Sequence, residues 1–374
     1  MTPDPEQPPG SLEFVDNTTG SNCPRCGGLR YRGPFGETCP RCLLATAEDV
    51  PAADVGRETG GTASDTPGAG RDRLFEHFEV SLRPDGSWWE LGRGALGVTY
   101  RATDVDSLSP VALKLVERMA APGSITPATA FQHAVAVAKL RHSNIARLVH
   151  LGAANDGRCF VVAQLVEGRT LAEIVHRAGR LPVSLALEIA GQCVQALVAA
   201  LEHRLRHGNF HPGNVMLVDR AGQDAPLVVL LDFGVADWFR GSTAAPAAAA
   251  QESRAEFACP EDRSGGASDA RADFYSLGAV VYFAVTGAAP RFDAVASRVH
   301  FSPLREHGVP EELIQWLRRL LDMNPATRPR DAFALADSLA ALRATLKQAR
   351  PTSPPAGRVE TTRWWRRWMH GQAD

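Results

Sequence analysis

Residues 88–116 read WWELGRGALGVTYRATDVDSLSPVALKLV, and the order of patterns in this stretch decides the fold. Runs of β-branched and aromatic residues predict strands at 88–91, 98–102 and 111–116. A GxGxxGxV pattern joins the first two strands, and its glycines allow the backbone to lie against phosphate groups without Cβ clashes. A dinucleotide-binding pattern of similar form joins a strand to a helix, so this context indicates a different nucleotide-binding fold. The pattern residues are Gly92, Gly94, Gly97 and Val98.

The rest of the chain adds helices to this strand-rich beginning. We expect a helix at 129–140 and a further strand at 160–165. After Leu171 a helical periodicity dominates, and it predicts helices at 181–203, 273–286, 311–321 and 331–344. A strand-rich part followed by a helix-rich part predicts an α+β fold with two lobes.

Composition divides the chain into five parts. Apolar residues are dense over 74–346, which is the predicted folded domain. Residues 46–73 are rich in Ala, Gly, Thr, Asp and Pro and bury too little apolar surface to fold, so we expect a linker there. Residues 1–20 are expected to be disordered, residues 21–45 contain four clustered cysteines, and residues 347–374 form a polar tail with a Trp/Arg cluster.

The overall composition argues against several classes of protein. The formal net charge of −2 gives no support for nucleic-acid binding by the whole chain. The N-terminal segment lacks the apolar stretch of a signal peptide. No run reaches the roughly 20 apolar residues that span a bilayer. We therefore expect a cytoplasmic protein in a reducing compartment.

The four clustered cysteines have the spacing of a metal site. Two CxxC pairs, separated by twelve residues, can place four thiolates tetrahedrally around one zinc ion. Two disulfides would use the same cysteines, but a reducing compartment favours metal binding. The segment resembles a zinc ribbon, and metal binding would supply the folding free energy of so short a unit. The predicted zinc ligands are Cys23, Cys26, Cys39 and Cys42.

Further motifs follow the glycine pattern along the chain. Val111-Ala112-Leu113-Lys114 lies on the third predicted strand, a loop runs from His207 to Asn214, and Asp232-Phe233-Gly234 comes next. In this order the motifs resemble those of bacterial eukaryotic-like Ser/Thr protein kinases, over about residues 77–345. The resemblance implies a bilobal protein-kinase fold that binds ATP and Mg²⁺.

The resemblance also implies roles for individual residues. Lys114 would contact the α/β-phosphates, and Asn214 and Asp232 would bind Mg²⁺. Gln164 to Val166 would hold adenine through backbone groups, with Ala163 as a small gatekeeper. The implied nucleotide-binding residues are Gly92, Gly94, Gly97, Val98, Ala112, Lys114, Ala163, Gln164, Val166, Asn214 and Asp232.

Two further landmarks imply parts of the framework. Ala258-Cys259-Pro260-Glu261 stands where the family has its APE motif, and Arg328 is similar to the buried ion-pair partner of that glutamate. The helix that begins near Asp273 resembles the helix that braces the catalytic loop. Both landmarks belong to the helical lobe.

The catalytic loop departs from the family pattern at its centre. The family's HRDxxxxN reads His207-Gly208-Asn209-Phe210-His211-Pro212-Gly213-Asn214, so Asn209 takes the place of the aspartate that orients the substrate hydroxyl. Its amide is a very poor base, and general-base assistance contributes about 10²–10⁴ in rate. Gly208 replaces the arginine that reads activation-loop phosphorylation, and His211 replaces a phosphate-stabilising lysine. A similar HGDxHPxN loop in aminoglycoside-phosphotransferase-like kinases keeps the aspartate.

Two positions outside the loop also differ from the family. The helix expected to supply a glutamate to Lys114 has His133 at that place and contains no carboxylate. Arg254 stands where a substrate-positioning threonine is expected. Both changes weaken the resemblance to an efficient peptide kinase.

Three functions fit these observations. The first is a pseudokinase, an ATP/Mg²⁺-binding module with impaired transfer and a signalling or scaffold role. The second is an active Ser/Thr protein kinase that transfers the ATP γ-phosphate to protein hydroxyls, and the third is a small-molecule phosphotransferase. The tail contains Arg363-Trp364-Trp365-Arg366-Arg367-Trp368, which suits weak contact with a membrane surface or an acidic partner. The other interpretation, which we favour, is a disordered tail. The protein substrate or partner is not specified by the sequence.

Overall fold

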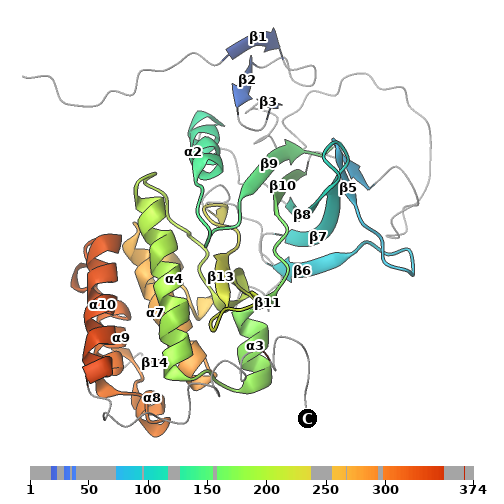
Figure 1. The fold of residues 1–374 in the computed structure, drawn as a ribbon. Helices are drawn as coiled ribbons and strands as arrows, with labels where there is room; N and C mark the ends of the chain where they lie inside the picture. The colour runs from blue at the N-terminus through green and yellow to red at the C-terminus, as the bar shows by residue number, and fades with distance from the viewer. Residues whose placement is uncertain are drawn as a thin grey trace, which may run out of the picture.

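A computed structural model of the protein describes residues 18–22, 29–33, 36–38, 73–94, 97–116, 127–154, 158–236, 255–266, 268–293, 298–348 and 366. The kinase-like region forms two lobes, one a curled sheet and the other mainly helical (Figure 1). Several predictions fall outside the described residues and stay predictions; they concern Cys23, Cys26, Cys39 and Cys42, the position of Arg254, and the tail beyond Gln348 apart from Arg366.

The first lobe is built on a seven-stranded sheet whose strand pairs are all antiparallel. Its core contains Phe75, Phe78 and Phe160, whose rings meet edge to face. The strands, in spatial order, are β4 (Leu74–Phe75), β5 (Phe78–Val80), β7 (Gly97–Asp104), β8 (Ser109–Val116), β10 (Cys159–Gln164) and β9 (Leu148–Ala153), and β6 (Glu90–Gly94) pairs with β7.

Strand β8 shows how the sequence pattern orients side chains. Val111, Leu113 and Leu115 are buried in the core of the first lobe, and alternation along a strand places Ala112 and Lys114 on the opposite face. That face looks toward the second lobe. The predicted strand at 111–116 is therefore confirmed, with two residues added at its start.

Helix α2 (Pro127–Lys139) lies beside this sheet and contacts β9 (Figure 1). Ala134, Val137 and Ala138 are buried at the junction of the two lobes. The helix ends one residue before the predicted boundary at Leu140 and begins two residues earlier than predicted.

The second lobe is a helical bundle around α7 (Arg271–Thr286), from which nearly every side chain is buried. Helix α4 (Val183–Leu201) packs against α7 and α10 (Ala332–Gln348), and α9 (Glu311–Leu320) packs against the same two helices. The remaining helices are α3 (Leu171–Ala178), α6 (Pro260–Arg263), α8 (Ser302–Glu306), and the 3₁₀ turns η1 (Pro212–Asn214) and η3 (Pro325–Thr327). Each of the four long predicted helices is confirmed within a few residues.

Among the described helices, α4 is long and apolar enough to cross a membrane by length and composition. However, 56% of its most apolar window is buried inside the fold, where it contacts α7, α10 and β13. Its composition therefore reflects its place at the centre of the helical lobe.

A small sheet within the second lobe was not predicted. It has the order β11 (Arg169–Thr170), β12 (Val215–Val218) and β13 (Leu227–Leu230), and a separate pair joins β14 (Phe292–Asp293) to β15 (Arg298–Val299). Two side chains connect β13 to neighbouring segments. Asn144, which precedes β9, donates to the Val228 carbonyl at 2.7 Å, and Gln192 of α4 accepts from the Val228 amide at 2.9 Å. The strands β12 and β13 carry the catalytic loop and Asp232 at their ends.

The N-terminal part contains a separate antiparallel sheet of β1 (Thr18–Asn22), β2 (Leu29–Gly33) and β3 (Gly36–Thr38). Strand β1 starts three residues inside the range 1–20, for which the sequence predicts disorder. Cys23 follows β1 directly and Cys39 follows β3 directly in the sequence. The cysteines themselves lie outside the described residues, so the zinc ribbon stays a prediction.

Candidate functional site

A cleft of about 660 Å³ lies between the lobes. It brings together residues from β6, β7 and β8, the segment after β10, the catalytic loop, β12 and the segment after β13. Every predicted nucleotide-binding residue except Gly97 and Val98 lines it, and so does Asn209. The predicted residues that line the cleft are Gly92, Gly94, Ala112, Lys114, Ala163, Gln164, Val166, Asn214 and Asp232.

Gly97 and Val98 serve the sheet instead. Gly97 has φ of 136°, and a Cβ atom there would lie 2.0 Å from the Leu115 carbonyl oxygen of β8. Glycine is thus required because two strands approach closely. Val98 is buried and only 4% exposed. By contrast, a Cβ atom at Gly92 or Gly94 would meet nothing within 4 Å, which leaves an open backbone surface above the cleft.

Lys114 and Asp232 form an ion pair at the back of the cleft. Lys114 is held in the middle of the sheet by pairing with Thr99 on one side and Val161 on the other. Burial would raise the pKa of Asp232, but the charge and hydrogen bond of Lys114, together with His207 and His211, outweigh this effect and hold that pKa below its ordinary value. Asp232 is therefore an anion in the cleft, available to a cation.

Asp232 also has an unusual backbone conformation, with φ of 55°. Non-glycine residues adopt this left-handed region infrequently, and Asp is one of the residue types that tolerate it. The next two residues continue a turn, in which the Gly234 amide donates to the His207 carbonyl at 3.2 Å. This hydrogen bond joins the Asp232 segment to the catalytic loop.

The catalytic loop is anchored by Asp273 of α7, as the resemblance implies. The carboxylate of Asp273 accepts hydrogen bonds from the amides of His207 at 2.6 Å and Gly208 at 3.0 Å. Asp273 is only 2% exposed, so these are charge-assisted bonds in a buried setting. The prediction that this helix braces the loop is confirmed.

Asn209 lies in the cleft next to Asn214. The Asn214 side chain donates from Nδ2 to the Asn209 carbonyl at 2.9 Å, and the Asn209 amide donates to His207 Nδ1 at 3.3 Å. Because Asn214 uses its nitrogen in this bond, its Oδ1 atom is the ligand it can offer to a cation. Asn209 contributes an amide side chain where a general base would need a carboxylate.

His211 lines the cleft between Asn209 and Asn214. Its Nδ1 accepts a hydrogen bond of 3.2 Å from the Gly213 amide at the start of η1. A neutral ring with Nδ1 as acceptor carries its proton on Nε2. His211 also contributes to the lowered pKa of Asp232, after Lys114 and His207.

His133 of α2 approaches the turn after Asp232. A Cβ atom placed on Gly234 would lie 3.6 Å from His133 Cε1 and 2.6 Å from Val137 Cγ2. The helix face predicted to meet Lys114 therefore reaches the Asp232 segment. Since α2 contains no carboxylate, the anion that pairs with Lys114 is Asp232.

The predicted ion pair between Glu261 and Arg328 is confirmed. It is bidentate, with distances of 2.6 Å and 3.0 Å, and the Arg328 side chain is 0% exposed. Burial would raise the pKa of Glu261, but the hydrogen bonds and charge of Arg328, together with a backbone hydrogen bond, outweigh this and keep that pKa below its ordinary value. The pair fixes α6 to the segment before α10.

Several residues that line the cleft were missed by sequence reasoning. Leu91, Met216 and Leu231 add apolar surface, and Thr170 and Glu173 lie at its edge. Met216 and Leu231 belong to strands or strand ends in the small sheet, which the helical periodicity of the surrounding sequence obscures. The short apolar run Val215-Met216-Leu217-Val218, which follows the turn residues Pro212-Gly213, is the signal that could have indicated a strand at Met216.

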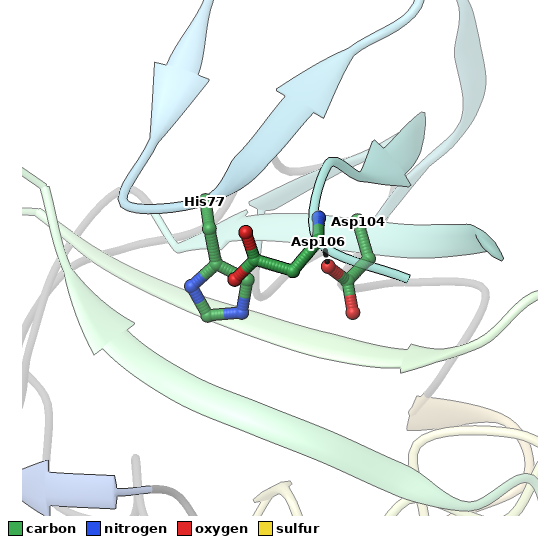
Figure 2. A group of neighbouring side chains, drawn as sticks. All are labelled: His77, Asp104 and Asp106. Carbon is green, nitrogen blue, oxygen red and sulfur yellow. Dashed lines mark hydrogen bonds between the residues drawn. The ribbon is translucent and has the colours of Figure 1, made fainter. Parts of the chain in front are cut away.

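A second group of possible ligand atoms lies outside the cleft. Donor atoms of His77, Asp104 and Asp106 lie within 4.8 Å of one another, as Figure 2 shows. Asp104 Oδ1 accepts hydrogen bonds from the amides of Asp106 at 3.0 Å and Ser107 at 3.3 Å, which fold the turn after β7. The turn explains why these carboxylates lie together, and we assign no metal to them.

Comparisons with known proteins agree with this architecture. The family model for the protein kinase domain matches residues 88–339. The chain is 30% identical over 223 residues to the Ser/Thr-protein kinase PknB of Mycobacterium leprae, covering 59% of this chain and 35% of that protein. It is 32% identical over 284 residues to PknA of Mycobacterium tuberculosis, covering 72% of this chain and 64% of that protein. The chain thus spans between about a third and two thirds of the length of these relatives.

Solved structures show the same fold. The PknI kinase domain of Mycobacterium tuberculosis matches with a TM-score of 0.56 at 23% identity, covering 74% of this chain and 100% of that domain. A structure of Rad53 residues 1–466 in complex with AMP-PNP matches with a TM-score of 0.54 at 20% identity, covering 70% of this chain and 65% of that one. With the family model covering more than half of the sequence, the chain belongs to the protein kinase family, with bacterial Ser/Thr kinases among its relatives.

Proposed function

We propose that the chain binds ATP with Mg²⁺ in the cleft between its lobes and transfers the γ-phosphate poorly, so that its role is signalling or scaffolding. The observation that carries this proposal is Asn209. It lies in the cleft beside Asn214, with an amide in place of the carboxylate that orients and accepts the proton of a substrate hydroxyl. The module would report nucleotide binding to a partner through its conformation.

The residues present fit the nucleotide and its metal. Lys114 supplies a cation, Asp232 an anionic oxygen and Asn214 an amide oxygen, and hard oxygen ligands suit Mg²⁺. The open backbone at Gly92 and Gly94 leaves room for phosphates over the cleft. The match to Rad53 in complex with AMP-PNP adds support from a related fold. When bound, Mg²⁺ would neutralise charge on the phosphates.

The chain's own residues explain why transfer would be slow. Phosphoryl transfer relies on positioning and electrostatic stabilisation, which Lys114 and Asp232 can supply. Asn209 can orient a hydroxyl through its side-chain oxygen but cannot take its proton. The missing base assistance corresponds to about 10²–10⁴ in rate, or roughly 3–5.5 kcal/mol of barrier.

The alternative is an active Ser/Thr protein kinase that transfers phosphate to protein hydroxyls. The retained Lys114, Asn214 and Asp232, together with a catalytic loop anchored on Asp273, favour this alternative. A small-molecule phosphotransferase is supported only by the His-Pro-Gly-Asn sequence of the loop.

A paired assay separates these functions. Two quantities are measured for wild type, Asn209→Asp and Asp232→Ala. The first is the affinity for a fluorescent ATP analogue. The second is the rate of phosphate transfer from labelled ATP to the chain itself and to general protein substrates. We expect the wild type to bind the analogue with Mg²⁺ and to transfer at least about 100-fold more slowly than Asn209→Asp. Wild-type transfer equal to that of Asn209→Asp, and abolished by Asp232→Ala, would favour the active kinase. A wild type that does not bind the nucleotide with Mg²⁺ would refute both the proposed function and the active kinase.

We further propose that the N-terminal segment binds one zinc ion through Cys23, Cys26, Cys39 and Cys42. The proposal is supported by their paired spacing and by the antiparallel strands β1, β2 and β3 that lie between and beside them in the sequence. Zinc binding requires reduced cysteines, which a cytoplasmic location would provide.

A further inference from the structure

Arg206 lies immediately before the catalytic loop, and its side chain is only 11% exposed. Its Nη1 atom donates a hydrogen bond of 2.6 Å to the Ser268 hydroxyl and lies 3.6 Å from Asp262 Oδ1. The Ser268 hydroxyl in turn donates to the same Asp262 oxygen. These three residues, the Arg206 clamp, join the catalytic loop to the segment that contains α6.

Both ends of the clamp are attached to the rigid frame of the helical lobe. On the loop side, the amides of His207 and Gly208 are held by Asp273 of α7. On the α6 side, Glu261 is paired with the buried Arg328. The clamp is therefore a direct link between two segments that are each anchored to this frame.

The position in the family that reads a phosphorylated residue is Gly208 in this chain. Gly208 has φ of 72°, a conformation that side-chain-bearing residues adopt at a cost, so an arginine is disfavoured there. Arg206, two residues earlier, places its guanidinium on a carboxylate and a hydroxyl. These groups are present in the unmodified chain.

We propose that Arg206 is a positioning residue that holds the catalytic loop against the α6 segment without phosphorylation of the chain. Asn209 and Asn214 are linked to one another in that loop, and the Gly234 amide ties the Asp232 segment to His207. The clamp thus orders the side of the cleft that would bind Mg²⁺. The adenine side, formed by β10 and the segment after it, does not depend on the clamp.

The test uses the full chain and four variants. Arg206→Ala removes the clamp, and Arg206→Lys keeps a cation for Asp262. Ser268→Ala removes the two hydrogen bonds of the hydroxyl but leaves Arg206 facing Asp262. Arg204→Ala is the matched control, because Arg204 is exposed and lies two residues earlier. The first readout is amide hydrogen exchange in the peptide that contains His207 and Gly208, which needs no nucleotide.

We expect Arg206→Ala to speed exchange in this peptide by about tenfold, with a smaller effect from Ser268→Ala and partial recovery in Arg206→Lys. Exchange in β10 and α4 should stay unchanged. Phosphatase treatment of the wild type should leave the loop peptide unchanged. Equal acceleration throughout the chain, an effect no larger than that of Arg204→Ala, or loosening of the loop by phosphatase would each overturn the proposal.

The second readout rests on the proposed function. The affinities of the wild type and of Arg206→Ala are measured for adenosine, and for an ATP analogue with and without Mg²⁺. We expect Arg206→Ala to keep the wild-type affinity for adenosine and to lose most of the increase in analogue affinity that Mg²⁺ produces. An unchanged Mg²⁺ effect, in a wild type that binds nucleotide, counts against the clamp. If the wild type binds no nucleotide, the proposed function fails, and hydrogen exchange alone decides on Arg206.

Discussion

Replacing Glu261 by glutamine should destabilise the helical lobe strongly, although the two side chains have nearly the same size. The change removes the negative charge from a bidentate pair with Arg328, whose side chain is 0% exposed. In this variant the guanidinium still donates to the carbonyls of Asp322 and Arg271 at 3.0 Å, but its buried charge loses the carboxylate with which it is paired. Removing one partner from a buried ion pair costs about 3–5 kcal/mol. We expect a loss of that order in the free energy of unfolding.

The assay is urea denaturation followed by far-UV circular dichroism at pH 7, with Glu311→Gln as a matched control. Glu311 forms a similar bidentate contact with Arg305, but these side chains are 52% and 49% exposed, so its loss should cost about 0–1 kcal/mol. A loss below about 1 kcal/mol for Glu261→Gln, equal to that of the control, would contradict the view that this pair fixes α6.

The ion pair between Glu261 and Arg328 also predicts how the stability of the fold depends on pH. The pKa of Glu261 is lowered in the folded chain, so its ionised form stabilises the fold at pH values above the ordinary pKa of 4.5. This contribution is lost as the pH falls through the lowered, folded-state pKa. The difference in stability between wild type and Glu261→Gln should therefore be largest at neutral pH and shrink below about pH 4.5. A difference that grows on acidification would reverse the assigned sign.

Three further changes test other parts of the molecule. Gly97→Ala should lower the midpoint of thermal unfolding by several degrees, because its Cβ would lie 2.0 Å from the Leu115 carbonyl, whereas Gly92→Ala has open space and should leave the midpoint unchanged. Asp273→Asn weakens two charge-assisted hydrogen bonds, and we expect a loss of about 1.5–3 kcal/mol in urea denaturation, which an unchanged transition would refute. Cys39→Ser should reduce bound zinc, measured by elemental analysis, from one ion per chain toward none, and retained zinc would disprove the ligand set.

The parts of the fold that the sequence predicts well are those in which one periodicity covers a whole element. The burial alternation of β8 follows directly from Val111, Leu113 and Leu115, and it places Lys114 on the cleft side. The glycine pattern predicts that another group lies close to the backbone, but it does not identify that group. At Gly97 the approach is to β8, and only Gly92 and Gly94 face the cleft.

The parts that the sequence does not predict depend on contacts between distant segments. The strands β12 and β13 have four residues each, too few for a periodicity to stand out among helices. The pairing of Lys114 with Asp232 spans 118 residues and follows from the absence of a carboxylate on α2. The role of Arg206 cannot be predicted from the sequence for the same reason, since Ser268 lies 62 residues further along the chain and Asp262 belongs to the same distant segment.

The contacts of Asn209 explain how the fold can accommodate a change at the centre of the catalytic loop. Its hydrogen bonds with His207 and Asn214 use the backbone amide and carbonyl, which an aspartate would provide equally. An aspartate and an asparagine have nearly the same shape, so these two backbone hydrogen bonds do not depend on which of the two is present. The residues that line the cleft come from both lobes, whereas the proposed loss of proton transfer concerns this one side chain. Under the proposed function, an amide at position 209 would impair that step while the backbone contacts of the loop are retained.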